Sequence, residues 1–111
     1  MGDPLPVIPR GLATQDLRDA AGHYARAADP ATARRFIDAV EQAFTLIARQ
    51  PGTGSPRYAV DLDLPGLRAR PVERFTYLIF YFERTDHIDV VRILHAHRDI
   101  PASLQDPAEG T

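Results

Sequence analysis

Apolar residues are spaced differently in the two halves of the chain. Before residue 50 they recur three and four positions apart, and after residue 57 they tend to alternate with other residues. Spacings of three and four form one apolar stripe on an α-helix, whereas alternation forms one apolar face on a β-strand. A glycine- and proline-rich segment, 51–56, separates the two patterns. The chain is therefore expected to contain helices first and strands afterwards, as in an α+β layer fold.

Two helices are predicted, one over residues 13–28 and one from residue 30 to the end of the first half. The first apolar stripe comprises Leu17, Ala20, Ala21, Tyr24, Ala25 and Ala28. Asp29 and Pro30 mark a second start, because Asp is a favourable N-cap and Pro suits the first helical position. The second stripe comprises Ala33, Phe36, Ile37, Val40, Phe44, Ile47 and Ala48. The short break predicts an αα-hairpin, with Phe44 between its second helix and a sheet.

The second half of the chain contains runs that are typical of strands, at residues 58–62, 67–73, 75–82 and 88–95. Short turns join consecutive runs, and three of these four runs are expected to form an antiparallel meander. A short strand within residues 5–9 precedes the helices, and its prolines suit a strand edge or start. The predicted order is β-α-α-β-β-β, with the helices on one face of the sheet.

The length of 111 residues indicates a single domain, with a core over about 5–104 and a frayed polar tail at 105–111. The chain has no cysteine, and it has no apolar run of about 18 residues that could span a membrane. Its first residues lack the basic and apolar regions of a signal peptide. We therefore expect a cytoplasmic protein without a membrane segment.

The charge balance bears on the kind of partner. Thirteen basic residues, all of them arginine, face 15 acidic residues, which gives a net charge of -2. A protein that binds nucleic acid mainly through phosphates usually carries a basic surplus. The sequence therefore does not favour direct, specific DNA binding by this chain alone.

The run 75–82 is apolar on both of its predicted faces. Alternation separates its residues into two sets, Phe75, Tyr77, Ile79 and Tyr81 on one face and Thr76, Leu78, Phe80 and Phe82 on the other. One helical hairpin covers only one face, and a large exposed apolar patch usually marks an interaction site. A partner segment laid across the second face would cover it. The alternative is that the chain after Asp99 folds back over the same face.

Three stretches carry a family resemblance. The first is the helical pattern that includes Asp16-Leu17, Tyr24, Pro30, Ala33-Arg34-Arg35-Phe36, Ile47-Ala48 and Pro51, the second is the run 77–81, and the third is the segment 89–99. The third, DVVRILHAHRD, is similar to a V-x-R-V-L-H-x-x-R-D ending. Together, over about residues 7–104, they resemble the ParE/RelE superfamily of toxins from type II toxin–antitoxin modules, and the ending favours the ParE branch.

The resemblance implies growth inhibition, a role such as plasmid stabilisation, no cofactor, and neutralisation by a cognate antitoxin, expected to be a ParD-like ribbon-helix-helix protein. ParE-type members act on DNA gyrase, whereas RelE-type members cleave mRNA, usually on the ribosome. The net charge of -2 and the ParE-like ending favour a gyrase inhibitor over a RelE-like ribosome-dependent endoribonuclease. A degenerate member that binds its antitoxin but is no longer toxic is a third possibility.

The antitoxin is expected to cover the second strand face and a ridge of arginines that share one parity. The candidate antitoxin-binding residues are Leu78, Phe80, Phe82, Arg68, Arg70 and Arg74. In the nuclease alternative, these arginines would hold phosphates.

No residue is assigned firmly to catalysis. RNA cleavage through the 2′-hydroxyl needs a base, an acid and a cation near the phosphate. The nuclease candidates are His95, His97, Arg98, Arg70 and Tyr81. The competing interpretation is that His95 ends a strand on the face of Val91 and Ile93 and hydrogen-bonds the adjacent turn. His95 and His97 could begin a metal site, but the sequence marks no third ligand, so no metal is expected.

Overall fold

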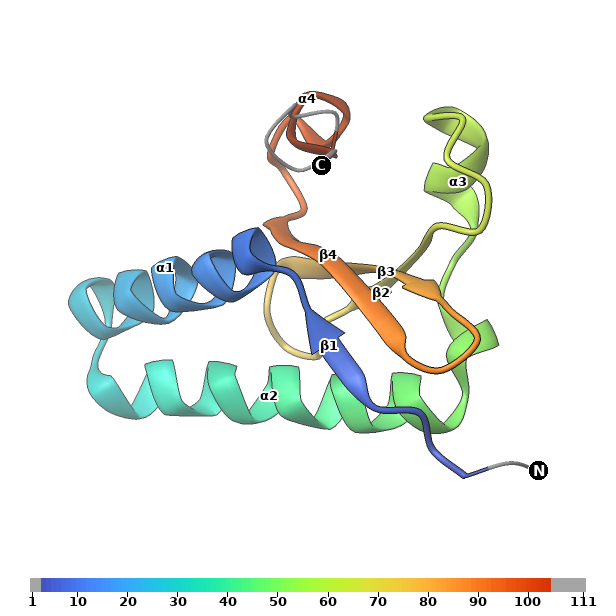
Figure 1. The fold of residues 1–111 in the computed structure, drawn as a ribbon. Helices are drawn as coiled ribbons and strands as arrows, with labels where there is room; N and C mark the ends of the chain where they lie inside the picture. The colour runs from blue at the N-terminus through green and yellow to red at the C-terminus, as the bar shows by residue number, and fades with distance from the viewer. Residues whose placement is uncertain (1–2, 105–111) are drawn as a thin grey trace.

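A computed structural model describes residues 3–104 of the chain. A helical hairpin forms the first layer of its fold. The chain runs through β1 (Val7–Pro9), α1 (Gly11–Ala27), α2 (Pro30–Arg49), η1 (Pro51–Thr53), α3 (Arg57–Asp61), β2 (Arg68–Pro71), β3 (Tyr77–Glu83), β4 (Ile88–His95) and α4 (Ile100–Leu104) (Figure 1). The prediction of a frayed tail at 105–111 lies outside the described residues.

The second helix begins where the sequence predicts. The Asp29 side chain accepts a hydrogen bond from the Thr32 backbone N–H at 2.7 Å, and Pro30 occupies the first helical position. This cap satisfies one of the backbone donors that a helix leaves unpaired at its start. The helix ends at Arg49, just before Pro51. The predicted αα-hairpin is therefore confirmed.

The sheet has four strands in the order β1-β4-β3-β2. The strand β3 pairs antiparallel with both β2 and β4, which confirms the predicted meander. The short strand β1 pairs parallel with β4, so the sheet is mixed. This pairing places the first and the last strand of the chain side by side.

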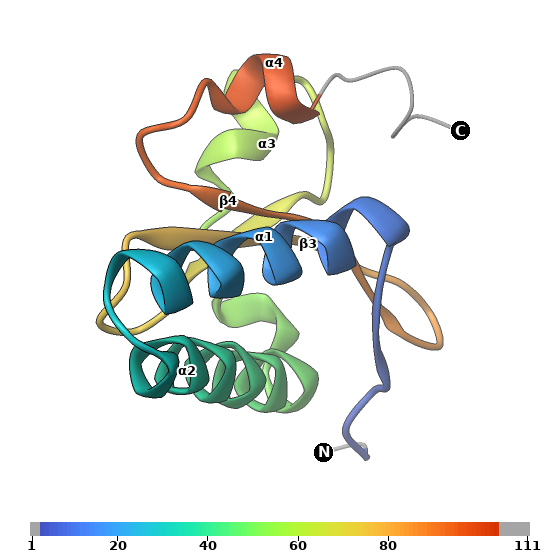
Figure 2. The ribbon, with the colours of Figure 1, turned by 90° about the vertical axis from the view of Figure 1, so that its left-hand side faces the viewer.

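The main core lies between the hairpin and one face of the sheet. Figure 2 shows α2 below the strands and α3 and α4 above them. Phe36, Val40 and Ile47 of α2 are fully buried in this core. Phe44 packs against the core but is only partly buried, so the expectation that it fills the space between helix and sheet is only partly met. Phe36 takes the central position.

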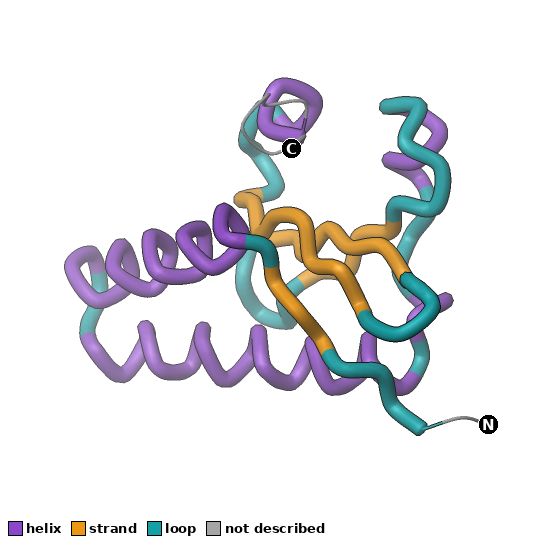
Figure 3. The backbone as a smooth tube through the Cα atoms, in the orientation of Figure 1, coloured by secondary structure: helices purple, strands orange, loops and turns teal. Residues whose placement is uncertain are grey.

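The second face of the sheet carries a smaller apolar cluster of its own. Its fully or nearly buried members are Leu67, Ala69, Phe80, Val91, Leu94, Ile100 and Leu104. The predicted strand at 58–62 is wrong, because this segment forms the short helix α3 (Figure 3). Tyr58, Ala59 and Leu62 pack on the second cluster, while Val60 is 83% exposed. That spacing of contacts is helical rather than alternating.

The chain after Asp99 also folds back over the second face. Ile100 and Leu104 of α4 are buried in the second cluster. Asp99 accepts a hydrogen bond from the Ala102 N–H at 3.2 Å and so caps this short helix. The alternative cover considered for the second face is thus present, and it shares that face with α3.

A bulge in β4 changes the faces on which its residues lie. Phe80 pairs with Arg92 and Tyr81 pairs with Val90, which leaves Val91 as the extra residue. Val91 belongs to the second cluster, whereas Ile93 belongs to the main core. The prediction that His95 shares a face with both Val91 and Ile93 is therefore wrong. Bulges break the strict alternation from which that prediction followed.

Candidate functional site

Tyr81, one of the nuclease candidates, is fully buried and has a structural role. Its hydroxyl donates a hydrogen bond to the Pro51 carbonyl at 2.6 Å and accepts one from the Gly54 N–H at 3.1 Å. Burial raises the pKa of the Tyr81 hydroxyl above its usual value. A side chain at Gly54 would collide with this hydroxyl, so glycine is needed there. Tyr81 fastens the connector after α2 to the sheet and has no path to a substrate.

Arg68 and Arg70 lie beside the same connector. The Arg68 guanidinium donates to the Gly54 carbonyl at 2.8 Å, and that of Arg70 donates to the Thr53 hydroxyl at 3.0 Å. Their charges act to lower the pKa of Tyr81, against the stronger effect of its burial, which places both arginines near that hydroxyl. The third predicted arginine, Arg74, lies in the β2–β3 turn beside α2.

The candidate antitoxin-binding residues are therefore divided between two surfaces. Leu78, Phe80 and Phe82 belong to the second face of the sheet, which α3 and α4 flank. Arg68, Arg70 and Arg74 lie on the side of the sheet that faces α2 and η1. On the second face, Phe80 is fully buried, whereas Leu78 and Phe82 remain partly accessible.

His95, His97 and Arg98 come together in the turn after β4. The two imidazole centroids are 5.3 Å apart, and the His97 N–H donates to His95 Nδ1 at 3.2 Å. The Arg98 N–H donates to the His95 carbonyl at 3.0 Å. These hydrogen bonds within the turn are the ones expected if His95 has a structural role rather than a catalytic one. Since His95 Nδ1 is an acceptor, the neutral ring carries its proton on Nε2.

The five nuclease candidates do not converge. His95 pairs with Tyr77 at one end of β3, and Tyr81 lies four residues further along, about 13 Å away. A small hollow beside His95, about 150 Å³, is lined by Asp16, Asp19, Ala20, Tyr77, Ile93, His95 and Arg98. It contains neither Tyr81 nor Arg70, so no single position reaches all five side chains.

A buried ion pair that sequence reasoning missed joins α1, β4 and α4. Asp16 accepts hydrogen bonds from Arg92 Nε at 2.8 Å and Nη2 at 2.9 Å, and from the Ile93 N–H at 3.0 Å. Arg92 Nη1 also donates to the Ser103 carbonyl of α4 at 3.1 Å. An arginine within the apolar run IDVVRILH was the available signal, because a buried guanidinium requires a carboxylate partner.

A second charged group lies where β1 meets β4. Asp89 accepts two hydrogen bonds from Arg10, both at 3.0 Å, and two from Arg84, at 2.9 and 3.2 Å. The Arg84 guanidinium also lies 4.4 Å from the centroid of the Phe82 ring. Next to Asp89 in the register is Ile8 of β1, whose side chain is 53% exposed. We call Ile8, Arg10, Phe82 and Arg84 the arginine-rimmed surface.

Stability at low pH should depend on Asp89. Hydrogen bonds from Arg10, and then from Arg84, hold the pKa of this carboxyl below its usual value. Between that lowered pKa and the unfolded value of about 3.9, the unfolded chain binds more protons, so stability falls as the pH falls. Urea denaturation from pH 6 to pH 2.5 should show a smaller acid-dependent loss for Asp89→Asn than for the wild type. Equal losses would show that this carboxyl does not contribute to acid sensitivity.

Across residues 3–104, no three histidine or acidic side chains gather in a way that could hold a metal ion. None of the helices described there is long and apolar enough to cross a membrane.

The helical hairpin on a four-stranded mixed sheet makes this chain a small α+β domain. The family model described as ParE toxin of type II toxin-antitoxin system, parDE, matches residues 7–100. The chain belongs to the ParE toxin family.

A solved structure described as the chromosomal ParDE TA system from P. aeruginosa has a similar fold. The TM-score is 0.70 at 19% sequence identity, and the match covers 82% of this chain and 95% of the other. At this identity, the likeness supports the fold alone. No curated protein matches the sequence.

Proposed function

We propose that this ParE-family toxin acts in the cytoplasm by binding and inhibiting DNA gyrase, and that a cognate ParD-like antitoxin of the ribbon-helix-helix type neutralises it. The family assignment supports a toxin of a type II toxin–antitoxin module. The gyrase target and the kind of antitoxin are our inference from the ParE branch and from the surfaces of this chain.

The observation that carries the proposal is the position of Tyr81. In the nuclease alternative this hydroxyl would assist cleavage, but it is buried and bonded to the backbone at Pro51 and Gly54. Arg70 is bonded to Thr53, away from the histidine turn. A general acid or base must come within hydrogen-bond reach of the proton that it transfers. The arrangement thus supports inhibition by binding over cleavage by this set of residues.

The arginine-rimmed surface is the best place for the antitoxin. It combines the exposed Ile8 and the partly accessible Phe82 with two guanidinium groups that share the single carboxylate of Asp89. The Arg84 side chain is 44% exposed, so its guanidinium remains accessible at the rim. An amphipathic antitoxin segment would place apolar side chains on Ile8 and Phe82 and an acidic side chain near Arg84. Leu78 lies further along the same face of the sheet. Phe80 is fully buried and would support this surface from beneath without contacting the antitoxin.

The gyrase and nuclease mechanisms differ in what they require of His97. If gyrase is the target, His97→Ala should leave toxicity largely intact, because no proton transfer depends on this exposed imidazole. If the chain is a nuclease, the same substitution should lower cleavage by roughly 10²–10⁴-fold, the usual contribution of general acid–base catalysis. The measurement is translation-coupled mRNA cleavage, mapped by primer extension, for the wild type and His97→Ala.

Strong cleavage at the ribosomal A site by the wild type, lost in a folded His97→Ala protein, would contradict the proposal. The absence of cleavage by either protein, together with inhibition of supercoiling by both, would support it. Circular dichroism of His97→Ala provides the control for folding. Inactivity of both proteins in both assays would instead indicate the degenerate member of the family.

A further inference from the structure

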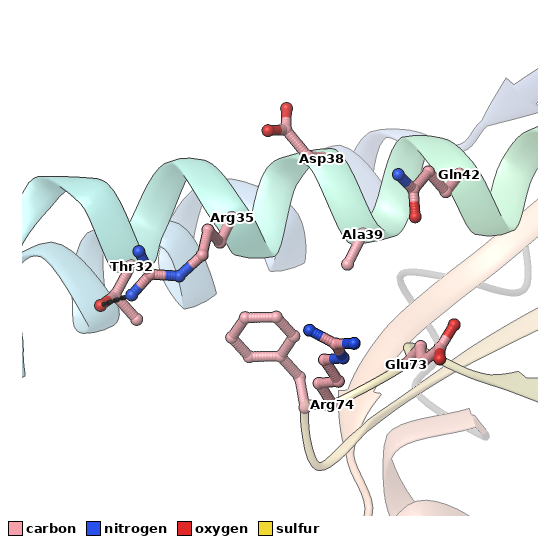
Figure 4. A pocket seen from close by; sticks show the side chains of 8 residues that line it. Thr32, Arg35, Asp38, Ala39, Gln42, Glu73 and Arg74 are labelled. Atoms are coloured by element: carbon pink, nitrogen blue, oxygen red, sulfur yellow. Dashed lines mark hydrogen bonds between the residues drawn. The ribbon is translucent and has the colours of Figure 1, made fainter.

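A polar pocket lies between α2 and the turn that joins β2 to β3, on the side of the sheet opposite to α3 and α4. Its volume is about 590 Å³, and its lining consists of Thr32, Arg35, Asp38, Ala39, Gln42, Glu73, Arg74 and Phe75 (Figure 4). Neither the antitoxin surface proposed above nor the core requires such a hollow here.

The turn beside the pocket holds an arginine in an unfavourable backbone conformation. The Phe75 N–H donates to the Val72 carbonyl at 3.1 Å, and Arg74 has a φ of 71°. A four-residue turn with a positive φ only at its third position is of type II, where glycine is strongly preferred. A long side chain in the left-handed region is strained, and such strain clusters at functional positions. The side chain of Arg74 therefore calls for a functional explanation.

The Arg74 guanidinium is the cationic group directed into the pocket. Figure 4 shows the Arg74 guanidinium directed toward α2, near Ala39, whereas the Asp38 carboxylate points away from the turn. Arg35 donates to the Thr32 hydroxyl at 2.9 Å, which keeps its guanidinium along the pocket wall. Glu73 remains as the acidic group at the turn. The arrangement suits a single carboxylate at the Arg74 guanidinium.

We propose that this pocket receives an acidic side chain from the surface of DNA gyrase, with Arg74 as its main contact. This inference rests on the proposed function. A long-lived toxin–antitoxin contact favours an apolar surface such as that around Ile8 and Phe82, whereas transient contacts are more polar. The polar pocket on the other side of the sheet thus fits the target rather than the antitoxin.

Arg74→Gly tests the assignment, because it removes the guanidinium and also relieves the strain. The purified variant should require about tenfold more protein to inhibit supercoiling by bacterial gyrase, the effect of losing one interfacial charge contact. Its melting temperature should rise by about 4 °C, since glycine adopts a positive φ without strain. Its affinity for the antitoxin should stay within about twofold of the wild-type value.

Two matched variants separate charge from backbone. Arg74→Lys keeps a cation and the strained conformation, and it should recover most of the inhibition. Arg34→Ala removes an exposed arginine of α2 that does not line the pocket, and it should inhibit as the wild type does. Unchanged inhibition by Arg74→Gly would overturn the pocket assignment while leaving the proposed function standing. A matching loss of antitoxin affinity would assign the pocket to the antitoxin instead, and failure of the wild type to inhibit gyrase would overturn both proposals.

Discussion

Asp16→Ala is expected to lower the free energy of unfolding by about 3–5 kcal/mol, the usual effect of removing one partner from a buried ion pair. The side chains of Asp16 and Arg92 are only 9% and 6% exposed. The substitution takes away a carboxylate that accepts three hydrogen bonds, one of them from the backbone of β4. A small domain is stable by only about 5–15 kcal/mol, so much of its stability would be lost. Urea denaturation at pH 7 measures the change.

A double replacement, Asp16→Leu with Arg92→Met, provides the matched comparison. It replaces both members of the buried Arg92–Asp16 pair by apolar side chains. We expect it to be more stable than Asp16→Ala, although the Ile93 N–H and the Ser103 carbonyl lose their partners. A free energy of unfolding for Asp16→Ala within 1 kcal/mol of the wild type would show that the pair does not hold α1 and α4 to β4.

Phe36→Ala is expected to cost about 3–5 kcal/mol, the range for removing a buried aromatic ring. Phe36 is fully buried, and its ring lies 5.1–5.2 Å from the rings of Tyr24, Phe75 and Tyr77. Its removal leaves a cavity where α2 meets both α1 and the sheet. The same urea denaturation experiment reports the loss.

Phe44→Ala is the matched control, because it removes the same side chain from the same helix. Phe44 is only partly buried, so its removal opens a smaller cavity and should cost clearly less. An equal or larger loss for Phe44→Ala would mean that the face of α2 buried against the sheet is not the one described above.

The helical layer could be predicted because local signals agree with the tertiary packing. Asp29 and Pro30 fix the start of α2, and Pro51 limits its end. The apolar stripe of α2 also gave its core face, with Phe36 and Val40 in the centre. The stripe also included Phe44, which lies at its edge. A pattern of apolar residues alone does not show what fraction of each side chain is buried.

The strand predictions failed where alternation was the only signal. Residues 58–62 were predicted as a strand, whereas packing of Tyr58 and Leu62 on the second cluster goes with a helical turn. The bulge at Val91 has no local sequence signal, and it moved that residue away from the face of Ile93. Both outcomes depend on contacts between segments that are distant in the chain.

The candidate site residues were chosen by chemical type, and their surroundings decided what they do. Tyr81 is an acid–base candidate by type, but its hydroxyl is hydrogen-bonded to the backbone of the glycine-containing connector at 51–56. Arg74 was expected on a strand ridge with Arg68 and Arg70, whereas it lies in a turn with a positive φ. A backbone conformation of this kind cannot be predicted from a residue that normally avoids it.

Whether this toxin acts by binding gyrase can be measured in a plasmid supercoiling assay with purified components. Relaxed plasmid, ATP and bacterial gyrase are incubated with increasing toxin, with and without an equimolar amount of the cognate antitoxin. We expect the toxin to lower the supercoiled fraction in a dose-dependent manner and the antitoxin to restore it. Full supercoiling at a molar excess of folded toxin over gyrase would show that gyrase is not the target.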